Sequence, residues 1–508
     1  MEFLRANGRK VCAGEREILL RGVGLGGWLL PEGYMWKFYT KCDRPRHMEA
    51  LIEALCGEAY TQTFWERYYD SYITERDIAW IAAQGLNSVR LAINSRTLFQ
   101  IGGERQVAFR RDIISRIDRC IEWCRKYGIY LFLDMHGAPG GQTGTNIDDS
   151  ENDAPELFTK AENQAFLLQM WRLLAERYRN EPIVGGYDLL NEPITKHNAH
   201  LYSQLVPLYR RLIAVIRAVD KEHMIVLEGV HWATDFSVFE ALSADEADNI
   251  VLEFHKYWSD PDEESLSSYL AMAERLNVPL WMGEGGENNL GWYTYAFPMY
   301  ERLGIGWCFW TYKKMETPNS PATFAQPTHW NAILSYLDGG GRPSREIACA
   351  AFDGFLSAIS QGSFHDEVLN AALRKPPLEI PAAAFDAAQI VSHRIQGAVF
   401  RTESPATILF ADGHTGLVDW KRYGGEPQPE EERLLLHLQA GDTVAYRVSL
   451  DEASGFCAEV RFFGSGVLLL QEQPIAPQMS RSFSAPSDGM IRLRCTEGEV
   501  SVETLFIR

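Results

Sequence analysis

Two glutamates, Glu192 and Glu284, have the sequence setting of catalytic carboxyl groups in this chain of 508 residues. Each closes a short apolar run and is followed by residues that a buried strand does not need. A pair of carboxyl groups in different environments can cleave a glycosidic bond, because one keeps a proton near neutral pH while the other stays ionised as a nucleophile. The remaining candidates also close apolar runs: Arg90, His136, Asn191, His255, Tyr257 and Trp310.

The side chains of these candidates suit a sugar-binding pocket. Arg90 and Tyr257 could keep Glu284 ionised through charge and hydrogen bonding. Asn191 could bind the 2-hydroxyl of a sugar, and Trp310 offers a flat floor for the apolar face of a pyranose ring. Each residue alone has an ordinary explanation in packing or ion pairing, so the prediction depends on the repetition of such residues along the chain.

Eight short apolar runs, separated by segments of helical periodicity, must position these residues. The runs cover residues 20–25, 88–93, 129–135, 186–190, 224–228, 250–254, 279–283 and 306–310. Near-continuous apolar strands indicate a parallel sheet that is covered on both faces. Eight β-α units of this length predict a (β/α)8 TIM barrel, in which the functional residues gather at the carboxyl ends of the strands.

An open sheet that binds a dinucleotide is the alternative architecture. Residues 22–27 fit the letters G-x-G-x-x-G of a phosphate-binding turn. However, Pro31 follows within four residues, so no long helix begins there, and no acidic partner for a ribose ends a second strand nearby. The barrel is therefore the favoured prediction.

The chain beyond the barrel has a different composition. A Pro-rich stretch at residues 374–381 suggests a link between domains, and short runs that alternate apolar and polar residues follow it. This alternation predicts an antiparallel β-sandwich. We therefore expect two domains, a catalytic barrel at residues 1–374 and a β-sandwich at residues 382–508.

Tryptophan is unevenly distributed between these two regions. Thirteen of the 14 Trp residues lie at or before Trp330, and only Trp420 lies after it. Together with Tyr423, Trp420 could form an aromatic platform for a sugar, pack against the barrel, or cover its active site. The β-sandwich faintly resembles carbohydrate-binding modules, and that resemblance leaves all three roles open.

The candidate site residues lie in motifs that resemble glycoside hydrolase family 5, the cellulase-type (β/α)8 retaining β-glycosidases. The matching segments are Ser-Val-Arg90-Leu, Leu-Asp-Met-His136-Gly, Leu-Asn191-Glu192-Pro, Phe-His255-Lys-Tyr257, Gly-Glu284 and Trp-Cys-Phe-Trp310. All eight positions that the family uses hold the expected residue type. The resemblance implies that Glu192 is the acid/base and Glu284 the nucleophile, with carboxyl groups about 5–5.5 Å apart.

Two further segments resemble the exo-β-1,3-glucanase branch of that family. Residues 21–29 are similar to its first-strand motif, and residues 136–142 are similar to its His-Gly-Ala-Pro-Gly loop. By this resemblance Glu32 and Trp28 belong to the site for the terminal sugar, although Pro31 precedes Glu32 where the family has Glu before Pro. Trp258 is a further candidate platform for a sugar ring.

The composition excludes several other classes of protein. Lys and Arg number 49 against 68 Asp and Glu, which gives a net charge of −19 and argues against a nucleic-acid partner. The sequence shows no signal peptide and no apolar run long enough to cross a bilayer. We therefore expect a cytoplasmic protein without a membrane partner. If a signal has been removed, we expect a secreted protein instead. Nine scattered Cys residues suggest reduced, packed thiols. The oligomeric state stays open.

We therefore predict a retaining β-glycosidase that hydrolyses β-glucosides or β-glucan oligosaccharides by double displacement, in an exo mode and with some glycosyl transfer. An endo-acting β-glucanase or a β-glycosidase for another sugar is the alternative. A non-catalytic carbohydrate-binding protein is an alternative of another class, but such a protein does not need both Glu192 and Glu284. A metal-dependent barrel hydrolase would usually show a His-x-His strand end, which this chain lacks. Its ligands would come from Asp134, His136, His231 and His255. We expect no cofactor and no metal.

Overall fold

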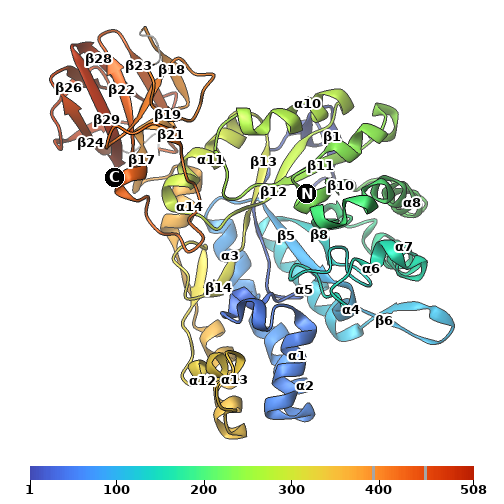
Figure 1. Ribbon diagram of the computed structural model, residues 1–508. Helices are drawn as coiled ribbons and strands as arrows, with labels where there is room; N and C mark the ends of the chain where they lie inside the picture. Colours follow the sequence, from blue (N-terminus) through green and yellow to red (C-terminus); the bar gives the residue numbers. More distant parts are fainter. Residues whose placement is uncertain (392–394, 451–454) are drawn as a thin grey trace. The chain divides into compact units, whose positions relative to one another are not determined.

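Eight parallel strands close into a barrel in the computed structural model, which describes residues 1–391, 395–450 and 455–508 (Figure 1). Around the barrel the strands are β4 (Arg21–Gly24), β5 (Ser88–Asn94), β8 (Tyr130–Gly137), β9 (Val184–Asp188), β10 (Met224–Glu228), β11 (Ile250–His255), β12 (Leu280–Gly286) and β13 (Gly306–Trp310). Each lies within a few residues of a predicted run. The structure therefore confirms the predicted (β/α)8 TIM barrel.

Helices follow the strands and cover the outside of the barrel (Figure 1). In α5 (Arg111–Tyr127), the side chains of Ile113, Ile117 and Ile121 recur every four residues and are buried, as the helical periodicity predicts. The helix ends at Gly128, whose φ of 72° suits a residue without a Cβ. The other helices of the barrel region are α1 (Pro45–Cys56), α2 (Glu58–Ser71), α3 (Glu75–Ala83), α4 (Ser95–Leu98), α6 (Glu156–Thr159), α7 (Ala161–Tyr178), α8 (Leu205–Arg217), α9 (Val230–Ala233), α10 (Ser267–Leu276), α12 (Trp330–Leu337) and α13 (Arg345–Ser360).

The amino end of the barrel is closed by an apolar cluster. A small antiparallel sheet of β1 (Leu4–Asn7), β2 (Lys10–Ala13) and β3 (Arg16–Glu17) supplies Leu4 and Val11 to this cluster. They are buried together with Phe132, Trp281 and further residues from the barrel strands. The barrel interior is thus packed and dry at this end, which leaves the carboxyl end as the place for polar side chains.

The chain forms two compact units, and neither is one continuous stretch. The first contains residues 1–256, 268–285 and 305–364, and the second contains residues 257–267, 286–304 and 365–508. This division reflects compactness rather than independent folding, so the expected domain limits at residues 374 and 382 stay a prediction.

Two antiparallel sheets make up most of the second unit. One joins β20 (Thr407–Phe410), β22 (Leu434–Gln439), β29 (Glu499–Ile507), β24 (Gly455–Gly464) and β27 (Ser480–Ser484), with β17 (Leu378–Pro381) also paired to β29. The other joins β18 (Ala387–Gln389), β23 (Thr443–Arg447), β28 (Met490–Glu497), β25 (Val467–Leu470) and β26 (Gln473–Ile475). Buried and exposed residues alternate along β22, β24 and β28, as the period-two pattern predicts. Part of the Pro-rich stretch forms β17 and so belongs to a sheet.

Helices α11 (Leu290–Arg302) and α14 (Asp366–Leu373) complete the second unit. The buried Arg374 guanidinium donates to the carbonyl oxygen of Thr294 in α11 at 2.6 Å and pairs with Asp386. Trp420 is only 5% exposed, packs on Phe400 with ring centroids 5.1 Å apart, and donates to Asp260 Oδ1 at 2.8 Å. Trp420 is therefore packed within the second unit, and its ring has no open face for a sugar.

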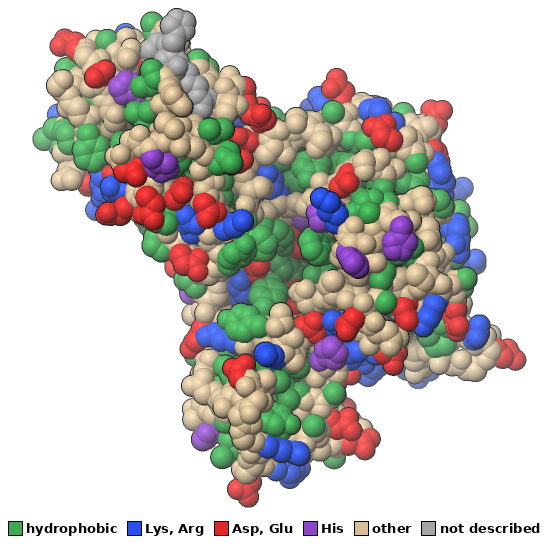
Figure 2. Space-filling view, viewed as in Figure 1, with side chains coloured by type: hydrophobic (Ala, Val, Ile, Leu, Met, Phe, Trp, Pro, Cys, Tyr) green, Lys and Arg blue, Asp and Glu red, His purple; other side chains and the backbone are tan. Residues whose placement is uncertain are grey.

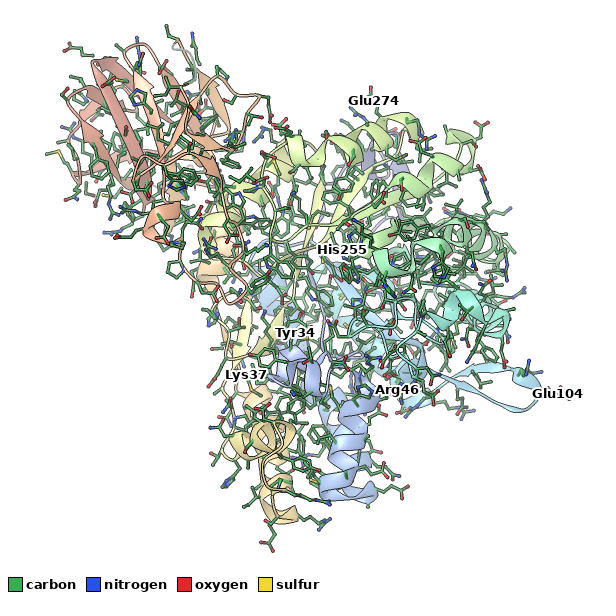
Figure 3. The ribbon with its side chains drawn as sticks, in the orientation of Figure 1. Tyr34, Lys37, Arg46, Glu104, His255 and Glu274 are labelled. Carbon is green, nitrogen blue, oxygen red and sulfur yellow. The ribbon has the colours of Figure 1, made fainter. Side chains whose placement is uncertain are left out.

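The surface carries charges of both signs. Figure 2 shows acidic and basic side chains interspersed on the visible face. The short hairpin of β6 (Phe99–Ile101) and β7 (Val107–Phe109) has Glu104 at its tip (Figure 3).

Among the residues that the structure describes, no helix has both the length and the apolar character needed to cross a membrane. All nine Cys residues are free thiols.

Candidate active site

A single buried guanidinium, that of Arg90 on β5, is surrounded by carboxyl groups from five other barrel strands. Each of these carboxyl groups has an oxygen 2.6–3.2 Å from an Arg90 nitrogen. They belong to Asp134, Asp188, Glu228, Glu253 and Glu284, whose side chains are at most 4% exposed. If all five were ionised, one positive charge would face five negative charges in a dry interior, which is strongly unfavourable.

Protons on some of these carboxyl groups resolve the imbalance. Burial raises the pKa of Asp134 to about 7 and that of Asp188 to about 6, although Arg90 acts in the opposite direction. Burial also raises the pKa of Glu228 and of Glu253 well above the usual range. After burial, the negative charge of Asp188 raises the pKa of Glu228 further, and that of Asp134 raises the pKa of Asp188. This buried cluster therefore holds protons at neutral pH.

Glu284 lies on β12, where it contacts the cluster and two histidines. Its Oε1 accepts a hydrogen bond from Arg90 at 2.6 Å, and its Oε2 lies 3.5 Å from His255 Nδ1. Burial raises its pKa, while His255, Arg90 and His136 favour the ionised form. The short contact with Arg90 suits a carboxylate, as a nucleophile requires.

Glu192 follows β9 in a backbone conformation that is unusual for a residue with a side chain. Its φ is 43°, in the left-handed region, and its N–H donates to Glu228 Oε2 at 2.6 Å. Its Oε1 lies 2.7 Å from His255 Nδ1. Burial raises the pKa of Glu192 to about 7, against the opposing effects of His136 and Arg90. A carboxyl group that still holds its proton near neutral pH suits a general acid.

His255 lies between the two glutamates, and Figure 3 shows it at the centre of the barrel. Glu192, Glu284 and His255 each present one side-chain atom within 4.8 Å of the others. Burial lowers the pKa of His255 to about 3, so the ring is neutral. One carboxyl oxygen of Glu192 thus lies within 4.8 Å of one of Glu284, an approach that suits a retaining site, in which the two carboxyl groups are roughly 5–5.5 Å apart.

His136, Asn191 and Trp310 form one side of the same site. The His136 ring stacks on the Trp310 ring with centroids 5.0 Å apart and an angle of 8° between planes. His136 Nδ1 lies 2.7 Å from Asp134 Oδ2, and burial lowers its pKa to about 4. The Asn191 Oδ1 accepts from Arg90 at 2.9 Å. These three residues are therefore held rigidly, as groups that orient a sugar must be.

Glu32 is also placed in this unit, but Trp28 has a different environment. Glu32 is 3% exposed and accepts a hydrogen bond from Asn146 Nδ2 at 3.2 Å. Trp28 is 1% exposed, and its indole N–H donates to the carbonyl oxygen of Tyr69 at 2.8 Å. The structure thus gives Trp28 a packing role and no open face for a sugar.

Tyr257 and Trp258 belong to the second unit, where they are parts of an aromatic group. Their rings stack at 5.1 Å, and the Trp258 ring meets that of Tyr423 edge-on at 4.6 Å. Trp258 and Tyr423 are 37% and 56% exposed. Trp258 therefore keeps an accessible ring, which suits the predicted platform.

Several residues of the site were not identified from the sequence. Glu228 and Glu253 contact Arg90 and lie near His255, and Tyr34 accepts a hydrogen bond from Trp310 Nε1 at 3.1 Å. Glu228 closes the predicted run 224–228, so the rule that selected Glu192 and Glu284 could have selected it as well. For Tyr34 we find no comparable signal in the sequence.

Two sets of side chains could converge on a metal ion. They are Glu192, His255 and Glu284, and Glu228, Glu253 and His255. Among the described residues, Asp134, His136 and His231 join neither set. Because Arg90 already contacts Glu228, Glu253 and Glu284, a cation there would compete with a guanidinium. The arrangement suits acid/base and nucleophilic chemistry better than metal binding.

The raised pKa values predict a bell-shaped dependence of kcat/KM on pH. Glu192 must hold its proton for the first step, so kcat/KM should fall about tenfold per pH unit above its pKa of about 7. Glu284 must be ionised, and burial raises its pKa, so the acidic limb should lie above the usual range of a glutamate. Initial rates on a phenyl β-glycoside, whose leaving group needs protonation, measure both limbs. Constant kcat/KM up to about pH 9 would contradict the role of Glu192 as an acid.

Gly283, which precedes Glu284 on β12, leaves room for the carboxyl group of Glu253. A Cβ on Gly283 would lie 1.4 Å from Glu253 Oε1. We expect Gly283→Ala to displace that carboxyl group, to lower stability by about 1–3 kcal/mol and to reduce activity. The control is Gly103→Ala, since no atom lies within 4 Å of a Cβ at that position. Thermal unfolding and kcat/KM of both variants test this, and equal behaviour would refute the steric argument.

Comparisons with known proteins agree with this geometry. The sequence model of cellulase, glycosyl hydrolase family 5, matches residues 53–316. A β-xylosidase of Phanerodontia chrysosporium is 31% identical over 240 residues, which are 47% of this chain and 48% of the xylosidase. A glucan 1,3-β-glucosidase of Blumeria graminis is 34% identical over 183 residues, 34% of this chain and 41% of that protein. Endoglucanase C of Acetivibrio thermocellus is 26% identical over 315 residues, 50% of this chain and 88% of the endoglucanase. The chain thus spans about half the length of the xylosidase, or less in the case of the glucosidase.

Proposed function

This chain belongs to glycosyl hydrolase family 5, the cellulase family, and we propose that it is a retaining β-glycosidase that releases sugars from the non-reducing end of β-glucosides or β-glucan oligosaccharides. The observation that carries the proposal is the pair of buried carboxyl groups of Glu192 and Glu284, which approach within 4.8 Å around a neutral His255. This spacing suits a double displacement.

In the first step Glu284 attacks the anomeric carbon while Glu192 donates its proton to the departing oxygen. The bond to the leaving group breaks, and a glycosyl ester on Glu284 forms. In the second step Glu192, now ionised, removes a proton from water, and that water displaces Glu284 from the anomeric carbon. A sugar hydroxyl in place of water would give glycosyl transfer. Asn191 and Trp310 would hold the ring, the first at the 2-hydroxyl and the second at its apolar face.

Bonds between loops support the exo mode. The carboxyl group of Asp149 accepts from the N–H of Arg46 at 3.0 Å, from Asn94 at 3.0 Å and from Arg96 at 2.5 Å. Arg46 lies in α1 after β4, Asn94 and Arg96 lie at the end of β5 and in α4, and Asp149 follows β8. Three β-α connections at the carboxyl end of the barrel are therefore tied together. A fixed wall of this kind suits a pocket for one terminal sugar, with Glu32 and Asn146 as polar groups that could bind its hydroxyls.

A panel of aryl β-glycosides and β-glucans, with product sizes followed over time, tests this proposal. Exo action predicts a monosaccharide as the only early product, whereas early mixed oligosaccharides would establish the endo alternative suggested by the similarity to endoglucanase C. The anomer formed first, followed by NMR, should have the β configuration of the substrate. An inverted product would defeat the double displacement.

A further inference from the structure

We propose that Glu228 is the positioning residue that holds the acid/base Glu192 in its working conformation and connects it to the nucleophile Glu284 through Arg90. This inference rests on the roles proposed above for the two glutamates. Glu228 itself lies at the carboxyl end of β10 and is fully buried. We therefore infer that Glu228 affects catalysis by holding other residues in place, and that it does not contact the substrate.

The bond between Glu228 and the Glu192 backbone is the first part of the argument. Glu192 has a φ of 43°, and Ile194, two residues later, has a φ of 56°. Left-handed conformations cost about 1–3 kcal/mol each for residues with a side chain and persist only where the surroundings enforce them. The N–H of Glu192 donates to Glu228 Oε2 at 2.6 Å in the buried interior. Without this acceptor the N–H would be left unsatisfied, and the segment could relax.

The second part is the position of the other Glu228 oxygen. Its Oε1 accepts from Arg90 at 2.8 Å, and another nitrogen of the same guanidinium donates to Glu284 Oε1 at 2.6 Å. A rigid guanidinium fork fixes both acceptors in one plane. A chain of hydrogen bonds therefore runs from the Glu192 N–H through Glu228 and Arg90 to Glu284. This chain fixes the distance between the acid/base and the nucleophile.

The strand that carries Glu228 is itself fixed. The hydroxyl of Tyr209 in α8 donates to the carbonyl oxygen of Glu228 at 2.8 Å. The strand also pairs with β11, where Glu228 is in register with Glu253. Glu228 can thus act as a support that does not move when Glu192 gains or loses its proton.

The experiment compares two leaving groups on the same sugar, 2,4-dinitrophenyl β-glucoside and phenyl β-glucoside. Dinitrophenolate departs without being protonated, whereas the departing phenolate needs a proton from the acid. We expect Glu228→Leu to lower kcat/KM for the phenyl glucoside by about 100-fold, as a misplacement of about 1 Å does, and to lower the dinitrophenyl value at least about tenfold less, because Glu284 keeps its own bond to Arg90. A wild-type protein that cleaves neither glucoside, nor the corresponding pair of any other sugar, would instead count against the proposed function.

Asp134→Leu is the matched control. Asp134 is fully buried and contacts Arg90 at 3.2 Å, but its other partner is His136 at 2.7 Å, whereas the Glu192 N–H donates to Glu228. Its loss should lower kcat/KM for the two glucosides by the same factor. Equal losses for the two glucosides in Glu228→Leu as well, or no loss for either, would overturn the proposal.

A second pair of variants keeps the test decisive if the leucine variants do not fold, which thermal unfolding would show. Glu228→Gln has one acceptor oxygen, so it can bond to the Glu192 N–H or to Arg90 but not to both. We expect a weaker loss, at least about fivefold for the phenyl glucoside, that is again larger for the phenyl than for the dinitrophenyl glucoside. Asp134→Asn is its control. Equal effects of Glu228→Gln on both glucosides would likewise reject the assignment.

Discussion

We expect the Glu284→Ala variant to lose at least about 10⁴-fold in kcat/KM on every β-glycoside that the protein cleaves, whatever the leaving group. The reason is that the glycosyl ester cannot form without this carboxylate, and the neighbouring groups cannot replace it. Glu192 approaches within 4.8 Å but is held by His255 and by its own backbone, and the other carboxyl groups of the cluster lie around Arg90. The measurement is the initial rate on dinitrophenyl, nitrophenyl and phenyl β-glucosides.

Two controls accompany this variant. Binding of a sugar inhibitor should persist, because Asn191, His136 and Trp310 keep their partners. Azide, a small nucleophile, should restore turnover by entering the space left by the side chain, and it should then attack the anomeric carbon directly and yield the glycosyl azide of inverted configuration. Retained activity, or an azide product of unchanged configuration, would exclude Glu284 as the nucleophile.

The Glu192→Ala variant should behave differently, because it removes the proton donor and leaves the nucleophile. We expect kcat/KM for phenyl β-glucoside to fall by about 10²–10⁴-fold, while the value for the dinitrophenyl substrate changes little. With the dinitrophenyl substrate the ester on Glu284 should accumulate, since no base activates water in the second step. A burst of dinitrophenol followed by slow turnover measures this behaviour.

Azide also distinguishes this second variant. It needs no base, so it should attack the ester on Glu284 and give a glycosyl azide with the configuration of the substrate. Glu192→Gln keeps the size of the side chain and controls for the space created by Ala. A uniform loss on all leaving groups would show that Glu192 supports the fold of the site and does not act as its acid. The basic limb of the pH profile, set by the pKa of about 7, should disappear in both variants.

The spacing of apolar runs was enough to predict the barrel. The runs at 224–228 and 306–310 coincide with β10 and β13. A parallel strand buried on both faces is apolar along its whole length, so it is visible without knowledge of its neighbours. The residues that follow such strands then lie at one end of the barrel, which is why Glu192 and Glu284 could be paired across 92 residues of sequence.

Rim residues were harder to predict from the sequence. The residue types of Trp28 and Trp420 suggest sugar platforms, but both side chains are buried, one bonded to Tyr69 and the other packed on Phe400. An aromatic side chain serves packing and sugar binding equally well, and only its exposure distinguishes the two uses. Trp258, in contrast, keeps an exposed ring.

The sequence by itself determined the order of the strands, the barrel, and the identity of the two facing glutamates, because these follow from hydrophobic periodicity and from the residues that end each run. Only the tertiary structure decided the protonation of the site. Burial, and the number of carboxyl groups around a single guanidinium, set the pKa of each acid. Glu253 lies inside a predicted run and looks like an ordinary strand residue until the barrel closes and brings it to Arg90 and His255. Charge interactions depend on distances through space, and a linear sequence does not contain those distances.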